Sequence, residues 1–269
     1  MTPLASIVVP LLRQPLAWLT QCVQSALRQT VPCEVLVVVS PRTPADLLQA
    51  LAEWRHVAPT LSVLPETGTG FAAALNTGIR ACRTKRIGFL LSDDWLESEA
   101  VETCLAHEAD IVSTGLRVFA EDGEAQFASL HRRPSQARYQ ALPSIDRRAA
   151  YLEHFFLFRR EALMKVGGVD ETIGSTGVDD FDLVWTLLEQ AASVVVVPDQ
   201  VYNYRDHGRE RLTLRAPALQ LRDLGKILDK HHVREEARER MLREHAVWFG
   251  APVHVVAERL AAGSVSVPT

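Results

Sequence analysis

Two adjacent carboxylates follow a short apolar run in the stretch Ile87-Gly-Phe-Leu-Leu-Ser-Asp-Asp-Trp95. The apolar run over residues 86–91 predicts a strand that is buried on both faces. Asp93 and Asp94 then lie at the carboxyl end of that strand, the edge at which open α/β sheets bind ligands. Carboxylate oxygens there suit Mg²⁺ or Mn²⁺, so a metal-assisted phosphate site is the first hypothesis. A second interpretation stays open, in which these acids, with Ser92, only cap the next helix.

Strand-like and helix-like segments alternate on both sides of this stretch through the first third of the chain. Runs of β-branched apolar residues predict strands, and apolar stripes with a period of 3.6 residues predict helices. Near-continuous apolar strands that alternate with helices are typical of a mostly parallel sheet covered by helices on both faces. The expected strands are 6–10, 34–40, 61–64 and 86–91, and the expected helices are 16–28, 44–56 and 71–82.

The pattern changes after residue 109. Residues 110–120 and 124–130 flank the turn Glu121-Asp-Gly123, which predicts a β-hairpin. Residues 131–148 are polar, rich in arginine and contain two prolines, so we expect a long surface loop there. The segments expected beyond it are helices at 160–166 and 179–190, strands at 193–197 and 201–205, and only helices from 217 onward. We therefore expect an α/β domain over residues 1–215 and a C-terminal helical extension over residues 216–269.

Composition and charge exclude several classes of protein. The chain has 269 residues and a net charge of −4, which argues against a general nucleic-acid binder. The four cysteines, Cys22, Cys33, Cys82 and Cys104, lack Cys-x-x-Cys spacing and are expected to be buried thiols, not disulfides or zinc ligands. The apolar run at the N-terminus stops at Arg13 and is too short to span a bilayer. We expect a soluble, cytoplasmic protein.

A glycine-rich motif, Gly68-Thr-Gly70-Phe-Ala-Ala73, matches the G-x-G-x-x-A pattern of dinucleotide sites. Asp93 follows at about the spacing of the acid that contacts the ribose in such sites. However, the motif comes after the third predicted strand, whereas the dinucleotide fingerprint belongs at the first strand-to-helix turn. Two other interpretations are a flexible turn and a phosphate-contacting loop at a helix N-terminus. An NAD-dependent oxidoreductase stays open as an alternative.

A second acidic cluster, Asp179-Asp180-Phe-Asp182, follows a glycine-rich stretch over residues 167–177 and begins a predicted helix. The helix dipole stabilises acids in a first turn, which is the simplest explanation of the cluster. A carboxylate held behind a loop that closes on substrate could also act as a general base. Further along, His207 and Arg211 could bind a metal and a phosphate, or belong to a solvated basic loop.

In this order, the motifs resemble those of the family 2 inverting glycosyltransferases of the GT-A fold, over roughly residues 4–214. Six loose motifs in the right order make the resemblance specific. They are Ser6-Ile-Val-Val-Pro10 with Glu34-Val-Leu-Val-Val38, the segment from Gly70 through Asn76 to Ile79, Phe89-Leu-Leu-Ser-Asp-Asp94, Gly167-Gly-Val-Asp-Glu171, Asp179-Asp180, and His207.

The resemblance implies a Rossmann-like GT-A domain over residues 1–215. It implies transfer of a sugar from a nucleoside-diphosphate-sugar donor to an acceptor hydroxyl, with inversion. Asp93, aided by Asp94 and His207, is expected to hold Mg²⁺ or Mn²⁺ on the diphosphate. Asp180 is the expected general base, and Asp179 is its nearest rival.

The remaining expectations concern donor, acceptor and assembly. Pro10, Gly70, Asn76 and Asp93 are expected to border the donor, with Arg211 on its phosphates. The acceptor is a glycan, a lipid-linked sugar or a small molecule. The arginine-rich segment and the C-terminal helices are expected to shape the acceptor site or a homo-oligomer contact, and a peripheral membrane contact is also considered.

Three departures from the family pattern lie near the expected nucleotide pocket. Val39-Ser-Pro-Arg42 stands where the family usually has Asp-Asp-Gly-Ser, so the acid that typically reads the nucleotide base is missing. Leu91 replaces the first acid of the Asp-x-Asp motif, and Leu11-Leu-Arg13 replaces Thr-Tyr-Asn. These changes leave open a protein that binds a nucleotide sugar without turning it over.

Overall fold

The computed structural model describes residues 2–173, 176–209, 212–214 and 216–262. Within these residues, eight strands form a single mixed sheet in the order β3-β2-β1-β4-β7-β6-β8-β5. The strands are β1 (Ala5–Leu11), β2 (Cys33–Val39), β3 (Leu61–Pro65), β4 (Arg86–Phe89), β5 (Trp95–Leu96), β6 (Ile111–Phe119), β7 (Phe156–Arg159) and β8 (Val194–Arg205).

The first half of the sheet is parallel, as the alternation of segments predicts. β1 pairs with β2 and β4, and β2 pairs with β3, all in parallel. Helices cross over between them: α1 (Leu16–Leu27), α2 (Ala45–Val57) and α3 (Phe71–Ala81). β7 then runs antiparallel to both of its neighbours, β4 and β6, and β8 returns parallel to β6.

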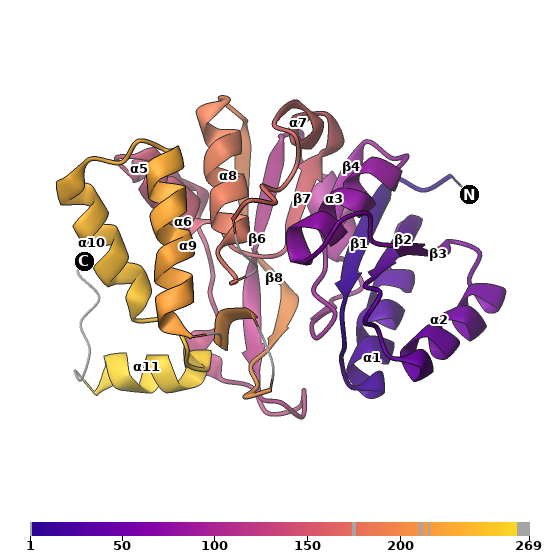
Figure 1. Cartoon of the computed structure of the whole chain (residues 1–269). Coiled ribbons are helices and arrows are strands. Elements are labelled where there is room, and N and C mark those ends of the chain that lie inside the picture. The colour runs from indigo at the N-terminus through magenta and orange to yellow at the C-terminus, as the bar shows by residue number, and fades with distance from the viewer. Residues whose placement is uncertain (1, 174–175, 210–211, 215, 263–269) are drawn as a thin grey trace.

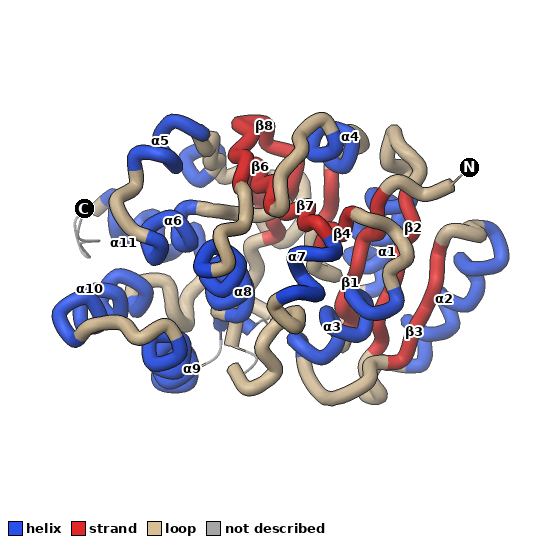
Figure 2. Tube along the Cα trace, turned by 90° about the horizontal axis from the view of Figure 1, so that it is seen from above, coloured by secondary structure: helices blue, strands red, loops and turns tan. Residues whose placement is uncertain are grey.

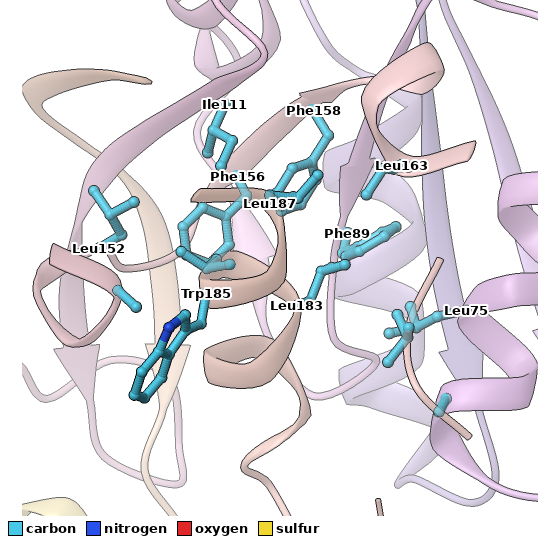
Figure 3. Packing of buried hydrophobic residues seen from close by; sticks show 14 of the residues in the cluster. Leu75, Phe89, Ile111, Leu152, Phe156, Phe158, Leu163, Leu183, Trp185 and Leu187 are labelled. Carbon is cyan, nitrogen blue, oxygen red and sulfur yellow. The ribbon is translucent and has the colours of Figure 1, made fainter. Parts of the chain in front are cut away.

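Two hydrophobic cores cover the two faces of the sheet, because side chains of a strand alternate between faces. Ile7 and Val9 of β1 face one core with α1, α2 and α4 (Ala100–Leu105). Val8 faces the other core with α3, α7 (Arg160–Lys165) and α8 (Asp179–Glu189). Figure 2 shows the strands running between these helices. Figure 3 shows part of the second core, where Phe156 and Phe158 of β7 pack with Leu183 and Leu187 of α8.

The expected hairpin over residues 110–130 is wrong in its second half. β6 forms, and β7 pairs with its first residues alone, Ile111 to Ser113. The returning chain contacts the rest of that edge at scattered points, a bridge between Phe119 and Gln126 and the hydrogen bond from the Phe127 N–H to the Val118 carbonyl oxygen, and then forms a 3₁₀ turn at Ala128–Leu130 instead of a continuous strand. The two strands expected at 193–197 and 201–205 are instead one strand, β8, whose pairing with β6 is irregular near Gly115.

The expected loop over residues 131–148 is also wrong, since it contains α5 (Gln136–Ala141) and begins α6 (Ile145–Tyr151). Pro134 and Pro143 stand just before the N-cap residues Ser135 and Ser144, where proline does not interrupt a helix. Tyr139 is buried beneath these short helices. Arg132, Arg133 and Arg138 are exposed, and the polarity of the segment is the reason that its helices were not predicted.

The C-terminal helices α9 (Pro217–Lys230), α10 (Glu235–Ala246) and α11 (Val253–Ala261) pack on the α6 and α8 side of the sheet (Figure 1). Asp182 of α8 accepts hydrogen bonds from Lys230 at 2.7 Å and pairs with His231 at 3.1 Å. Asp206, beyond β8, accepts from the backbone N–H groups of Val253 and His254 and so caps α11. Among the helices that the structure describes, none combines the length and apolar character that crossing a bilayer requires.

Candidate functional site

Asp93 and His207 meet although 114 positions separate them. The Asp93 Oδ2 atom lies 3.1 Å from His207 Nε2. The loop after β4 carries Asp93 and leads directly into β5, which pairs antiparallel with the end of β8. This short ladder brings Asp93 beside the chain that follows β8. The ring of Trp18 lies 4.7 Å from the imidazole of His207 and closes the site from α1.

Asp94 is bound to β8. It is 1% exposed, its Oδ1 accepts from the Arg205 backbone N–H at 2.7 Å, and its Oδ2 accepts from the Tyr202 hydroxyl at 2.5 Å. A buried carboxylate is tolerated only with such partners. Burial and the nearby Asp94 charge raise the pKa of Tyr202, which stays a donor. The bonds of Asp94 hold the loop after β4 against β8.

Arg205 is a site residue that the sequence analysis missed. Its guanidinium is buried, donates through Nε to the Asp93 carbonyl oxygen at 3.0 Å, and lies 4.9 Å and 4.8 Å from the ring centroids of Trp18 and Trp95. It therefore fixes the backbone that presents the Asp93 carboxylate. The sequence showed only an arginine at the end of a predicted strand. Its contacts with Trp18 and Trp95 depend on the fold and could not be predicted from the sequence.

Asp180 lies at the N-terminus of α8 with its side chain 49% exposed. Its Oδ2 is 3.2 Å from His154 Nε2, and its Oδ1 accepts from the Phe181 N–H at 2.8 Å. Desolvation raises the pKa of Asp180, but the hydrogen bonds from His154 and Phe181 outweigh it and hold that pKa below its ordinary value. Asp180 is therefore ionised at neutral pH and reachable from solvent.

Asp179, the neighbouring acid, is buried, and its pKa is shifted in the opposite direction to that of Asp180. It is 2% exposed, and neither carboxyl oxygen has a hydrogen-bond partner among the described residues. Burial, with the charge of Asp180, raises the pKa of Asp179 to about 7. Of the two acids that begin α8, only Asp180 combines exposure with a stable negative charge.

The Asp93 end and the Asp180 end of the site are connected through Tyr202. Its hydroxyl bonds Asp94, and its ring stacks on His154 with centroids 5.3 Å apart and planes at 27°. His154 in turn contacts Asp180. The sequence analysis did not single out His154 or Tyr202, because neither belongs to a motif.

Asn76 and the glycines serve as a clamp. The Asn76 amide donates to the Val169 carbonyl oxygen and to Glu171 Oε1, both at 2.8 Å, and its Oδ1 accepts from the Val169 N–H at 2.8 Å. Gly168 has φ +82°, and a Cβ there would lie 2.2 Å from Asn76 Oδ1, so only glycine fits. These bonds fasten the Gly-Gly segment to α3.

The other residues expected to border the donor are Pro10, Gly70 and Arg211. Pro10 is buried within β1, one residue before its end, and Gly70, with φ +102°, is the N-cap residue of α3. Arg211 lies outside the described residues. The glycine-rich motif precedes α3 at the β3 edge, away from the crevice between β1 and β4 where the strand order reverses. That position does not favour a dinucleotide site.

The residues present suit a divalent cation that a substrate helps to bind. Within the described part of the chain, no group of three or more His, Cys, Asp or Glu side chains is arranged to hold a metal. Mg²⁺ is usually bound by one or two carboxylates together with substrate phosphates. Imidazole is a common ligand of divalent transition-metal ions. Asp93 and His207 provide one ligand of each kind.

The family model described as glycosyl transferase family 2 matches residues 6–167, well over half of the chain. This chain belongs to glycosyl transferase family 2. It is 30% identical over 207 residues to the O-antigen biosynthesis protein RfbC of Myxococcus xanthus, an alignment that covers 76% of this chain and 16% of that protein. It is 36% identical over 103 residues to a chondroitin synthase of Escherichia coli, covering 38% of this chain and 15% of the synthase.

Solved structures show the fold of this family 2 chain. S. aureus TarS 1–349 in complex with UDP-GlcNAc has a TM-score of 0.64 at 17% identity, covering 91% of this chain and 72% of that one. The mannosyltransferase PcManGT from Pyrobaculum calidifontis, in complex with GDP-Man and Mn²⁺, has a TM-score of 0.64 at 18% identity. The match covers 98% of this chain and 76% of that one. The expected α/β GT-A architecture with C-terminal helices is confirmed. The chain spans under a fifth of the length of RfbC and of the chondroitin synthase.

Proposed function

We propose that this family 2 chain transfers a sugar from a nucleoside-diphosphate donor to an acceptor hydroxyl with inversion. The observation that carries the proposal is that Asp93 with His207, and the exposed Asp180, are linked through one chain of contacts at Tyr202. Complexes of structural neighbours with UDP-GlcNAc and with GDP-Man and Mn²⁺ support a nucleotide-sugar donor.

Asp93 and His207 are the residues that would hold Mg²⁺ or Mn²⁺. When bound, the cation would offset the charge that develops on the departing diphosphate. We give Asp94 a structural part instead of the metal-ligand role expected for it, because both of its oxygens accept hydrogen bonds from β8. Arg205 supports Asp93 by bonding its carbonyl oxygen.

Asp180 would act as the general base. As the acceptor oxygen forms its bond to the anomeric carbon, the bond to the diphosphate breaks on the opposite face of the sugar, and the hydroxyl proton passes to the Asp180 carboxylate. Attack from the opposite face inverts the anomeric configuration. A base must be ionised before the reaction and must reach the substrate, and Asp180 meets both conditions better than the enclosed Asp179.

The loop after β2 has no acid of its own, yet a carboxylate stands next to it. Glu66, which follows β3, accepts a hydrogen bond from Ser40 Oγ at 3.2 Å, and the Glu66 N–H donates to the Val39 carbonyl oxygen. We propose that Glu66 contacts the nucleotide base in place of the acid that is missing after β2, because a carboxylate can accept a hydrogen bond from the ring N–H of uracil or guanine.

A thermal-shift screen of UDP and GDP sugars, with and without Mn²⁺, tests the donor, because a ligand that binds the native state raises its stability. Release of nucleoside diphosphate in the presence of acceptor sugars then tests transfer. The second candidate, a binding protein without turnover, is favoured by the altered loop after β2. It predicts a thermal shift with the donor and no release with any acceptor.

A further inference from the structure

Hydrogen bonds and ring contacts fix both the backbone and the side chain of His154, although it lies in a loop. It lies between α6 and β7, and both of its neighbours bond β6: the Glu153 N–H donates to Ser113 Oγ at 3.1 Å, and the Phe155 N–H donates to Thr114 Oγ1 at 2.9 Å. Its ring stacks on Tyr202 and meets Phe156 edge-on with centroids 5.0 Å apart. The backbone and the ring are thus both fixed.

The surroundings of the ring leave Nε2 as its one paired nitrogen among the described residues. Nδ1 of His154 is buried and has no hydrogen-bond partner in that part of the chain. Nε2 faces Asp180 Oδ2 at 3.2 Å. An ionised carboxylate only accepts hydrogen bonds, so Nε2–H is the donor in this contact.

We infer that His154 is a positioning residue for Asp180: its Nε2–H holds the carboxylate in one ionised orientation, ready to accept the proton of the acceptor hydroxyl. The inference rests on the proposed function of Asp180 as the base. His154 itself neither gains nor loses a proton in the step. It stabilises the charged form of Asp180 before the reaction and restricts its rotation.

The other charged or titratable groups around Asp180 cannot replace this contact. Asp179 precedes it on α8 and repels its charge. Glu153 is paired with Arg132, and burial raises the pKa of Glu153. His245 of α10 faces the same region, but burial lowers the pKa of His245 to about 4, so it is neutral at pH 7.

The test compares His154→Ala with His154→Gln, whose amide N–H reaches about where Nε2–H is, and with His154→Asn, whose amide does not. The assay measures release of nucleoside diphosphate from the donor found by the thermal-shift screen. We expect His154→Ala and His154→Asn to lower kcat about tenfold, because a hydrogen bond to a charged group is lost. Donor KM stays unchanged. The acid limb of the kcat profile moves to higher pH, because Asp180 loses a donor to its charged form. His154→Gln restores kcat and the acid limb.

Several outcomes would overturn the inference. One is that Asp180→Asn abolishes release while His154→Ala, folded by its melting temperature, keeps the kcat and acid limb of wild type. Another is that His154→Gln is as impaired as His154→Ala. If Asp180→Asn itself has no effect, the proposed function fails instead. His56→Ala, an exposed histidine on α2, is the control and should match wild type.

A measurement without turnover tests the contact directly. Nitrogen-15 NMR of the folded protein at pH 7 should show His154 with a proton on Nε2. In Asp180→Asn, the Nε2–H signal should shift or broaden. A His154 ring without a proton on Nε2 would contradict the inference even if no acceptor were found.

Discussion

Tyr202 donates its hydroxyl proton to Asp94 Oδ2 at 2.5 Å, and both side chains are almost completely buried. This bond joins the end of β8 to the loop that presents Asp93. The loop after β4 has no regular pairing of its own until β5. The position of Asp93 therefore depends on a tyrosine 109 residues later in the chain.

Tyr202→Phe should lower the free energy of unfolding by about 1–3 kcal/mol, because a buried carboxylate oxygen loses its donor while the ring remains. Urea denaturation measures the change. Mn²⁺-dependent donor affinity should fall as well, since Asp93 is then less firmly placed. Unchanged stability would mean that water replaces the hydroxyl and that the bond does not hold the loop.

Asp93→Asn should abolish the Mn²⁺-dependent part of donor binding and leave the melting temperature close to that of wild type, because the side chain lies at the edge of the sheet. His207→Ala should weaken the same binding less, since the negatively charged ligand, Asp93, remains. Calorimetry with and without Mn²⁺ measures both, and Asp46→Asn on the exposed side of α2 is the control. Equal Mn²⁺-dependent affinity in Asp93→Asn and wild type would remove Asp93 from the metal site.

Asp180→Asn should reduce sugar transfer by about 10²- to 10⁴-fold, the usual loss on removing a general base. Donor affinity should change little, because the proposed function places the diphosphate at Asp93 and not at Asp180. A steady-state assay with calorimetry separates the two effects. If Asp179→Asn shows the larger loss in rate, the base is Asp179.

Asp179 makes the stability of the fold depend on pH. Its pKa is raised from 3.8 to about 7, so between these values the folded chain binds more protons than the unfolded chain. Stability from this group is present below about pH 4 and is lost as the pH rises toward 7. Asp179→Asn should therefore stabilise the protein at pH 8, on the order of 4 kcal/mol, and by much less at pH 4. Denaturant titrations at the two pH values check this, and a difference independent of pH would contradict it.

Truncation after residue 215 should lower solubility, because it exposes the surface that α9 covers. Leu224, Ile227 and Leu228 of α9 are fully buried. Removal of α9 and α11 also takes away the hydrogen bond from Lys230 to Asp182 and those from the Val253 and His254 N–H groups to Asp206. Size-exclusion chromatography and thermal unfolding measure the effect. A monodisperse truncated protein with the melting temperature of the full chain would show that the helices form an independent module.

Local sequence determined the parallel half of the sheet and that Asp93 follows the carboxyl end of a buried strand. Side chains of the β-branched runs in β1 and β2 alternate between the two cores. The helices predicted between these strands cross over from one parallel strand to the next, and such crossovers are almost always right-handed. A carboxylate at the end of a buried strand follows from the order of residues alone. The helix that begins at Asp179 follows in the same way from its periodicity and its acidic first turn.

The tertiary structure decided what those residues touch. The strands that pair regularly with β6 are β7 and β8, from far along the chain, whereas residues 124–130 touch its end at scattered points and turn into a 3₁₀ helix. His154, Tyr202 and Arg205 became site residues only because strand order places β7 and β8 beside β4 and β5. Periodicity is a property of neighbours in sequence, whereas a hydrogen bond such as that between His154 and Asp180 depends on which distant segments pack together.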